Sequence, residues 1–372
     1  MFESDDIGYM QRAIMLAKRG IYTTTPNPNV GCVIVQHGNI VGEGFHYQAG
    51  LPHAEVYALD MAGQQAKGAT AYVTLEPCSH HGKTPPCADA LIRAGIARVV
   101  IAMLDPNPLV AGQGVARLMS AGIAVESGLL AEQAEEINRG FLKRMRTGLP
   151  YVRLKMAASL DGRTAMASGE SKWITSALSR QDVQQFRAQS SAILSSSATI
   201  LADDPSLTVR WSELADEVKQ NYPQTEVRQP IRVVLDSQHR LTLQEQVFKQ
   251  PGCTWLVRKI GAKLPADVAP QIELLIDDAT TGPQVDLQYL LQRLGQKQIN
   301  TLWVEAGATL AGALIAQDLV DELIIYMAPK ILGDKARALC MIPELMTLSQ
   351  VPQFQFSDIT SIGSDIRMIL KK

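Results

Sequence analysis

Three short motifs, His53-Ala54-Glu55, Pro77-Cys78 and Pro86-Cys87, constrain this chain more than any other feature. One imidazole and two thiols bind Zn²⁺ well, and three protein ligands leave the fourth tetrahedral position open to water, as in catalytic rather than structural zinc sites. Water at such a site has its pKa lowered towards neutrality. Glu55 is expected not to bind the metal but to move protons off this water and onto a leaving amine. The fold must therefore bring these three motifs to one point.

This arrangement resembles that of the zinc deaminases of nucleobases, in which His-x-Glu is followed by Pro-Cys-x-x-Cys. Here residues 79–86, rather than two residues, separate the cysteines. The loop carries two histidines, a lysine and a threonine, which could bind an anionic group of a substrate. A polar loop is more often simply solvated, but beside two metal ligands we favour substrate contact.

The sequence around these motifs indicates where the ligands lie in the fold. The pattern after Glu55 predicts a helix, and the pattern from Cys87 onward predicts another, opened by Pro86. A thiol in a first helical turn has its thiolate form favoured. Because residues i and i+2 do not share a helix face, His53 and Glu55 can face one metal only at the start of their helix. A short strand is predicted at 71–75, before Cys78.

Composition places the chain among ordinary globular proteins of two domains. It has 372 residues, of which 46% are hydrophobic and 19% charged, with a net charge of -2. This charge and the lack of a dense basic run argue against a nucleic-acid partner. Five scattered cysteines give no disulfide framework, the N-terminus is acidic, and no apolar run could span a bilayer. We expect a cytoplasmic enzyme.

Alternating helix and strand patterns predict an α/β fold with helices on both faces of a sheet. A helix is expected at 5–20, a hairpin turning at 37–39, and a single helix at 131–146. Residues 147–150 break the pattern, so we divide the chain into domains 1–147 and 148–372. In the second domain, strands are expected at 151–156 and near 192–194, 231–235, 301–304 and 322–328, and helices at 286–294 and 310–316.

The second domain lacks the Gly-x-Gly-x-x-Gly pattern of standard dinucleotide folds. The segment Glu305–Thr309 is the nearest substitute, because it follows a strand, precedes a helix and has small residues that let backbone N–H groups approach a phosphate. Many strand-to-helix turns contain glycine, so these residues by themselves support a ligand-binding α/β domain and no more.

Longer stretches resemble the bifunctional deaminase/reductase family of riboflavin biosynthesis over nearly the whole chain. The resemblance is carried in the first half by Thr25–Gly31, His53–Glu55 and Glu76–Cys87, and in the second by Leu154–Arg163, Ser171–Thr175, Leu201–Pro205 and Trp303–Gly307. It implies an N-terminal three-layer domain similar to cytidine deaminase and a C-terminal domain similar to dihydrofolate reductase. The implied cofactors are Zn²⁺ and NADPH.

Two successive reactions are implied. The first removes the 2-amino group of a diaminopyrimidinone ribosylamine 5′-phosphate by hydrolysis, and the second uses NADPH to reduce the ribosyl group of the product to ribityl. The resemblance assigns the metal to His53, Cys78 and Cys87 and proton transfer to Glu55. It assigns substrate contacts to Asn27, His80, Lys83, Lys155, Ser171, Arg187, Leu207, Arg210 and Glu305. It assigns NADPH contacts to Ala157, Trp173, Thr199, Asp203, Ser237, Gly307, Ala308, Thr309, Leu310, Ala311, Gly312 and Ala313.

A second glycine, often found in this family directly after the glutamate, is Ala306 here. A methyl group leaves the backbone less freedom, so this change bears on cofactor affinity. We expect a homo-oligomer that acts on a small phosphorylated pyrimidine. Two rival interpretations are a deaminase with an inactive, structural second domain and a non-catalytic zinc-stabilised binding module. The second rival gives Glu55 no task and leaves a fourth zinc ligand missing.

Overall fold

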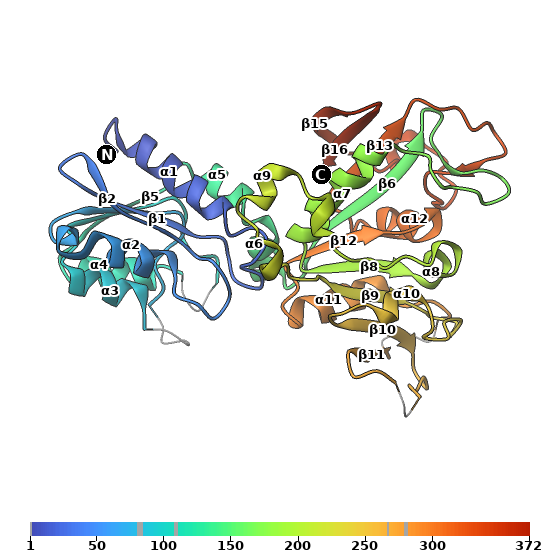
Figure 1. The fold of residues 1–372 in the computed structure, drawn as a ribbon, viewed down its shortest axis with the longest axis horizontal. Coiled ribbons are helices and arrows are strands. Elements are labelled where there is room, and N and C mark those ends of the chain that lie inside the picture. Colours follow the sequence, from blue (N-terminus) through green and yellow to red (C-terminus); the bar gives the residue numbers. More distant parts are fainter. Residues whose placement is uncertain (1, 80–84, 108–110, 266–267, 279–281) are drawn as a thin grey trace. The chain divides into compact units, whose positions relative to one another are not determined.

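The chain divides into two compact units, Met1–Gly148 and Leu149–Lys372, in a computed structural model. The structure describes residues 2–79, 85–107, 111–265, 268–278 and 282–372. Each unit contains its own mixed or mainly parallel sheet with helices packed on it (Figure 1). Within these ranges every helix is too short or too polar to cross a membrane.

The first unit is a five-stranded sheet in the order β2-β1-β3-β4-β5. Its strands are β1 Gly31–Gln36, β2 Asn39–Phe45, β3 Thr70–Val73, β4 Arg98–Ile101 and β5 Ala124–Ser127. Its helices are α1 Asp6–Lys18, α2 Ala54–Ala62, α3 Cys87–Ala94, α4 Gln113–Ser120, α5 Ala131–Glu136 and α6 Arg139–Thr147. The predicted hairpin is confirmed, because Gln36 pairs with Asn39 across a two-residue turn.

Glycines show that helices cover both faces of this sheet. A Cβ at Gly31 would lie 2.0 Å from the Ala13 carbonyl oxygen of α1, and a Cβ at Gly44 would lie 2.3 Å from the Ala54 carbonyl oxygen of α2. Because Gly44 pairs with Cys32, the neighbour of Gly31, these two glycines point to opposite faces. The unit is therefore three-layered, with α2, α3 and α4 on one side and α1 and α5 on the other (Figure 1).

The prediction of a single helix at 131–146 is wrong. Two helices, α5 and α6, are separated at Ile137 and Asn138. The buried Asn138 amide accepts from the backbone N–H of Asn29 and donates to its carbonyl oxygen, and the Asn29 side chain donates to the Ile137 carbonyl. These bonds tie the chain to a segment 109 residues away and hold the break between the helices.

The second unit is built on a nine-stranded sheet in the order β11-β10-β9-β8-β12-β6-β13-β16-β15. Its strands are β6 Tyr151–Ser159, β8 Ala192–Ser196, β9 Ile231–Leu235, β10 Thr254–Lys259, β11 Ile272–Asp277, β12 Thr301–Glu305, β13 Glu322–Ala328, β15 Gln355–Ile362 and β16 Asp365–Lys371. A separate two-stranded sheet pairs β7 Arg163–Ala165 with β14 Arg337–Ala338. Seven neighbouring strands, from β11 to β13, run parallel, and the β15–β16 pair is antiparallel.

Two hydrophobic cores lie on the two faces of this sheet. Leucines of α11 (Leu287–Gln296) and α12 (Ala308–Ala316) fill one core, and apolar residues of α7 (Ala177–Gln189), α8 (Ser197–Asp203) and α10 (Gln246–Lys249) fill the other. A last short helix is α9 Asp216–Lys219. In this topology the polar residues that follow β6, β8, β9 and β12 meet at one carboxyl edge of the sheet, where open α/β sheets bind ligands.

Candidate active sites

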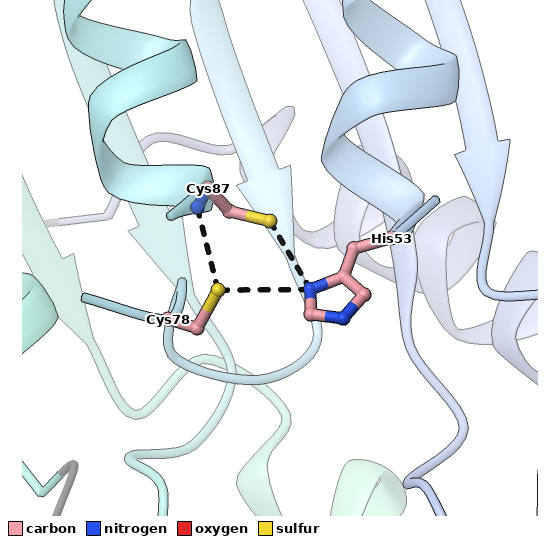
Figure 2. A group of neighbouring side chains, drawn as sticks. All are labelled: His53, Cys78 and Cys87. Atoms are coloured by element: carbon pink, nitrogen blue, oxygen red, sulfur yellow. Dashed lines mark hydrogen bonds between the residues drawn. The ribbon is translucent and has the colours of Figure 1, made fainter. Parts of the chain in front are cut away.

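The three predicted zinc ligands converge. His53 caps the N-terminus of α2, Cys78 lies in the loop after β3, and Cys87 is the first residue of α3. The His53 Nδ1 lies 3.6 Å from Cys78 Sγ and 3.3 Å from Cys87 Sγ (Figure 2). Zn–S bonds of about 2.3 Å and Zn–N bonds of about 2.0 Å place the ligand atoms of a tetrahedral site roughly 3.5–3.8 Å apart. The triad thus fits a zinc ion, and no further His, Cys, Asp or Glu of the described chain joins it.

The environment of the two thiols favours the thiolate of Cys78 and disfavours that of Cys87. The backbone N–H of Cys87, at the start of α3, donates to Cys78 Sγ over 3.3 Å. Hydrogen bonding by Cys87 and His53, opposed by burial, lowers the pKa of Cys78 to about 4, while the same contact with Cys78 raises the pKa of Cys87. A divalent cation bound between the two sulfurs would stabilise the thiolate form of both.

Glu55 lies in the first turn of α2, beside this triad, and only 3% of its surface is exposed. Burial raises its pKa to about 7, although the His53 imidazole acts in the opposite direction. Its Oε2 has no hydrogen-bond partner among the described residues. A buried carboxyl group with a free oxygen and a pKa near neutrality is suited to accept and return a proton.

Glu76 is a positioning residue that the sequence did not reveal. Its buried carboxylate accepts four backbone N–H bonds, from Asp105, Gly112, Gly114 and Val115, at 2.9–3.2 Å. These donors include the first turn of α4, so the bonds fix Glu76 and the ligand two residues later against the next loop. Gly114 permits this approach, because a Cβ there would lie 2.0 Å from the Pro77 carbonyl oxygen.

Asn27, expected to contact substrate, is held by a second residue that the sequence did not reveal. Its Nδ2 lies 3.0 Å from Nε2 of the buried His46, whose Nδ1 lies 3.1 Å from the Pro52 carbonyl oxygen. Because a carbonyl only accepts, Nδ1 carries the proton and Nε2 accepts from Asn27. The His46 ring also lies edge-on to His53 at 5.3 Å. His80 and Lys83 lie outside the described residues.

In the second unit, two expected substrate residues form a buried ion pair. The Arg187 guanidinium of α7 donates to both carboxylate oxygens of Glu305, at 2.6 and 2.9 Å, and to the Thr208 carbonyl oxygen at 2.9 Å. The Trp303 indole N–H donates to the same carboxylate over 2.8 Å. Burial would raise the pKa of Glu305, but Arg187 and its neighbours lower it to about 2. Glu305 is thus an anion at every ordinary pH.

Lys155 stands beside this pair, since it is the register partner of Glu305 on the adjacent strand β6. Burial lowers the pKa of Lys155, although the Glu305 carboxylate opposes this effect. The other expected substrate residues are spread along α7 and its neighbours. Leu207 is buried, and the Arg210 backbone N–H donates to Gln184 of α7. The Arg210 side chain is exposed and paired with Glu213.

The expected cofactor residues gather at the carboxyl edge of the sheet. Ala157 lies near the end of β6, Thr199 and Asp203 lie in α8, Ser237 follows β9, and Gly307–Ala313 span the start of α12. Lys172 Nζ donates to the Asp203 carbonyl oxygen over 3.1 Å, which ties α8 to the segment of Ser171 and the largely exposed Trp173. In α12, Leu310 and Ala311 point into the core, so only their backbone can meet a cofactor.

Comparisons with known proteins cover both units. A family described as "RibD C-terminal domain" matches residues 150–368, and one described as "Cytidine and deoxycytidylate deaminase zinc-binding region" matches residues 3–103. The riboflavin biosynthesis protein RibD of Escherichia coli is 61% identical over 360 residues, which cover 96% of this chain and 97% of that protein. That of Haemophilus influenzae is 56% identical over 369 residues, covering 99% and 97%.

Solved structures agree with these relatives. RibD of Acinetobacter baumannii superposes with a TM-score of 0.91 at 48% identity, over 99% of this chain and 98% of that chain. A diaminohydroxyphosphoribosylaminopyrimidine deaminase/5-amino-6-(5-phosphoribosylamino)uracil reductase from Thermotoga maritima superposes with a TM-score of 0.85 at 34% identity, over 98% of both chains. The expected fold class, a cytidine-deaminase-like domain followed by a reductase domain, is confirmed.

Proposed function

Because this chain belongs to the RibD family of riboflavin-biosynthesis enzymes, with both deaminase and reductase activity, we propose that residues 1–147 carry the deaminase site and residues 148–372 the reductase site. The observation that carries the first assignment is the convergence of His53, Cys78 and Cys87 beside the buried Glu55. The two rival interpretations, a structural second domain and a non-catalytic zinc module, receive no support from these relatives.

The deaminase half uses its own residues for ligand binding and proton transfer. His53, Cys78 and Cys87 would hold Zn²⁺, which would supply a strong nucleophile at neutral pH by lowering the pKa of water. Glu55 accepts the proton of the attacking water on its free Oε2 and delivers it to the leaving amine. Asn27, fixed through Nδ2 by His46, presents its Oδ1 to N–H groups of the pyrimidine. His80 and Lys83, in the loop between the cysteines, bind the polar groups of the ribose phosphate.

The reductase half uses NADPH as its hydride source, and its residues mainly position the reactants. The cluster of Lys155, Arg187 and Glu305 binds the substrate at the end of the sheet, together with Ser171, Leu207 and Arg210. Ala157, Trp173, Thr199, Asp203, Ser237 and Gly307–Ala313 bind the cofactor. The donor-rich carboxyl edge of the sheet, with backbone N–H groups at the start of α12, supports this assignment because NADPH presents phosphate acceptors.

The substrate class, the compartment and the oligomeric state are proposed from the net charge, the cysteines and the exposed edge of a sheet. The substrate is a small phosphorylated pyrimidine, and a net charge of -2 argues against nucleic acid. We place the enzyme in the cytoplasm, where five unpaired cysteines stay reduced. A homo-oligomer is proposed because the edge strand β15 exposes the apolar Phe356 and Ile359. Sedimentation at several concentrations tests this last point.

Replacement of Glu55 by glutamine tests the deaminase assignment most sharply. The amide keeps the size of the side chain but cannot carry a proton, so we expect full zinc content and a loss of ammonia release of about 10²–10⁴-fold. Reduction of the already deaminated product should be unchanged, which serves as the internal control. Turnover within a few-fold of the parent would make Glu55 a structural residue.

A further inference from the structure

Trp303, a buried residue outside the set expected to bind substrate or cofactor, contacts the carboxylate of Glu305. Both residues belong to β12 and lie two positions apart, so their side chains leave the same face of the sheet. The indole N–H of Trp303 donates to Oε1 of Glu305 over 2.8 Å. The Trp303 side chain is 0% exposed. The bond is therefore shielded from water, and a hydrogen bond to a charged group is strong in such surroundings.

The two carboxylate oxygens of Glu305 differ in the number of their donors. Oε1 accepts from Arg187 Nε over 2.6 Å and from Trp303 over 2.8 Å, which uses both of its lone pairs. Oε2 accepts from Arg187 Nη2 over 2.9 Å and from no other donor in the described ranges. One lone pair of Oε2 is thus left for a ligand. Because an ionised carboxylate only accepts, a hydroxyl group of the ribosyl moiety is a donor that suits it.

The indole of Trp303 is itself held in one orientation by α7. The Phe186 ring of this helix stacks on the indole, with ring centroids 5.1 Å apart and an angle of 6° between the planes. The guanidinium groups of Arg153 and Arg367 lie 5.9 and 5.8 Å from the centroid of Phe186, and each forms a salt bridge of its own. The stack therefore fixes the direction in which the N–H points before a substrate arrives.

We propose that Trp303 is a positioning residue of the reductase site: its N–H saturates Oε1 of Glu305, so that Oε2 is the oxygen that accepts a hydrogen bond from a ribosyl hydroxyl group. The Arg187 fork alone lets the carboxylate move with the guanidinium, whereas a third bond from the same strand fixes its plane. Trp303 is fully buried, so it acts through Glu305 and not by touching the substrate. The proposal rests on the proposed reductase function and adds to it a residue that orients the substrate.

The test measures kcat/KM for reduction of the deaminated intermediate by the full-length protein with NADPH. Trp303→Phe keeps an aromatic ring in the stack but removes the N–H. Its kcat/KM should fall about 10–100-fold, the loss expected for a hydrogen bond to a charged group. Ammonia release and the Kd for NADPH should be unchanged, because neither depends on the orientation of Glu305.

Trp303→His separates positioning from packing. An imidazole superposes on the five-membered ring of an indole and places its Nε2–H where the indole N–H was, although it fills less of the core than phenylalanine. A positioning role predicts that Trp303→His reduces the intermediate faster than Trp303→Phe. A packing role predicts the reverse order, because the histidine leaves the larger cavity.

Trp255→Phe is the matched control. Trp255 is also buried, at 6% exposure, and lies near the start of β10 in the same sheet. Its indole N–H donates to no oxygen of the described residues. The control should therefore reduce the intermediate as the parent does.

A Trp303→Phe protein that matches the parent, or a Trp303→His protein no faster than Trp303→Phe, would overturn the positioning role alone. Should neither variant fold, Phe186→Leu takes their place, because it keeps the N–H but removes the ring that orients it. That variant should reduce the intermediate more slowly with ammonia release unchanged, and an unaltered kcat/KM would overturn the proposal. A parent protein that oxidises no NADPH with the intermediate would overturn the reductase assignment as well.

Discussion

The buried pair of Glu305 and Arg187 allows a quantitative prediction for Glu305→Gln. The substitution keeps the shape of the side chain and can still accept one bond from Arg187 or Trp303, but it removes the negative charge that neutralises the guanidinium. The side chains of Arg187 and Glu305 are only 9% and 15% exposed. Water can therefore hydrate the unpaired guanidinium only poorly in place of the lost carboxylate. Removing one partner of such a pair leaves a buried charge unpaired, which typically costs about 3–5 kcal/mol.

The depressed pKa of Glu305 gives a second, independent value for the free energy by which this ion pair stabilises the fold. A pKa of about 2 against the usual 4.5 corresponds to about 3 kcal/mol of stability at neutral pH. Because the folded-state pKa is depressed, this stability is fully present above the unfolded-state value of 4.5 and is lost as the pH falls towards 2. We therefore expect Glu305→Gln to unfold about 3 kcal/mol more easily at pH 7, with a difference that shrinks between pH 5 and pH 3.

Tryptophan fluorescence during urea unfolding is the assay. All four tryptophans of the chain lie in the second unit, so their emission follows that unit alone although the protein has two domains. Glu273→Gln, which breaks the exposed pair with Lys297, is the control and should cost less than about 1 kcal/mol. A Glu305→Gln protein as stable as its parent at pH 7, or a difference that persists unchanged to pH 3, would refute the reasoning.

Two further predictions concern the metal centre. Cys87→Ala should lose stoichiometric zinc and ammonia release, as measured by metal analysis and assay; a variant that keeps both would remove Cys87 from the ligand set. Gly114→Ala should weaken zinc binding and destabilise the first unit by about 1–3 kcal/mol, because its Cβ would lie 2.0 Å from the Pro77 carbonyl oxygen. Gly8→Ala in α1, where nothing lies within 4 Å, is the control, and equal behaviour of the two variants would contradict the steric argument.

The sequence predicted those features whose chemistry is local. The zinc ligands stand in motifs whose residue types already select the metal, and Glu55 follows His53 by two residues, so helix geometry placed both at one helix start. The strand-to-helix turn at Glu305 was likewise predicted from its flanking pattern, and β12 and α12 lie there.

The features that the sequence did not predict depend on contacts between distant segments. Glu76 gains its role from backbone N–H groups 29–39 residues away, and His46 gains its role from Asn27 and Pro52. Periodicity continued through Asn138, but its bonds to Asn29 decided where the helix breaks. Neither periodicity nor residue type indicates such partners, because they are set by the packing of the whole unit.

We propose that one chain carries out deamination and then reduction. The most direct test of this proposal supplies the diaminopyrimidinone ribosylamine 5′-phosphate and NADPH to the zinc-loaded, full-length protein without oxygen, and follows ammonia release and NADPH oxidation together. We predict one NADPH oxidised for each ammonia released, with both lost in Glu55→Gln and only oxidation restored when the deaminated product is supplied. Ammonia release that is never followed by NADPH oxidation, even with that product supplied, would contradict the account.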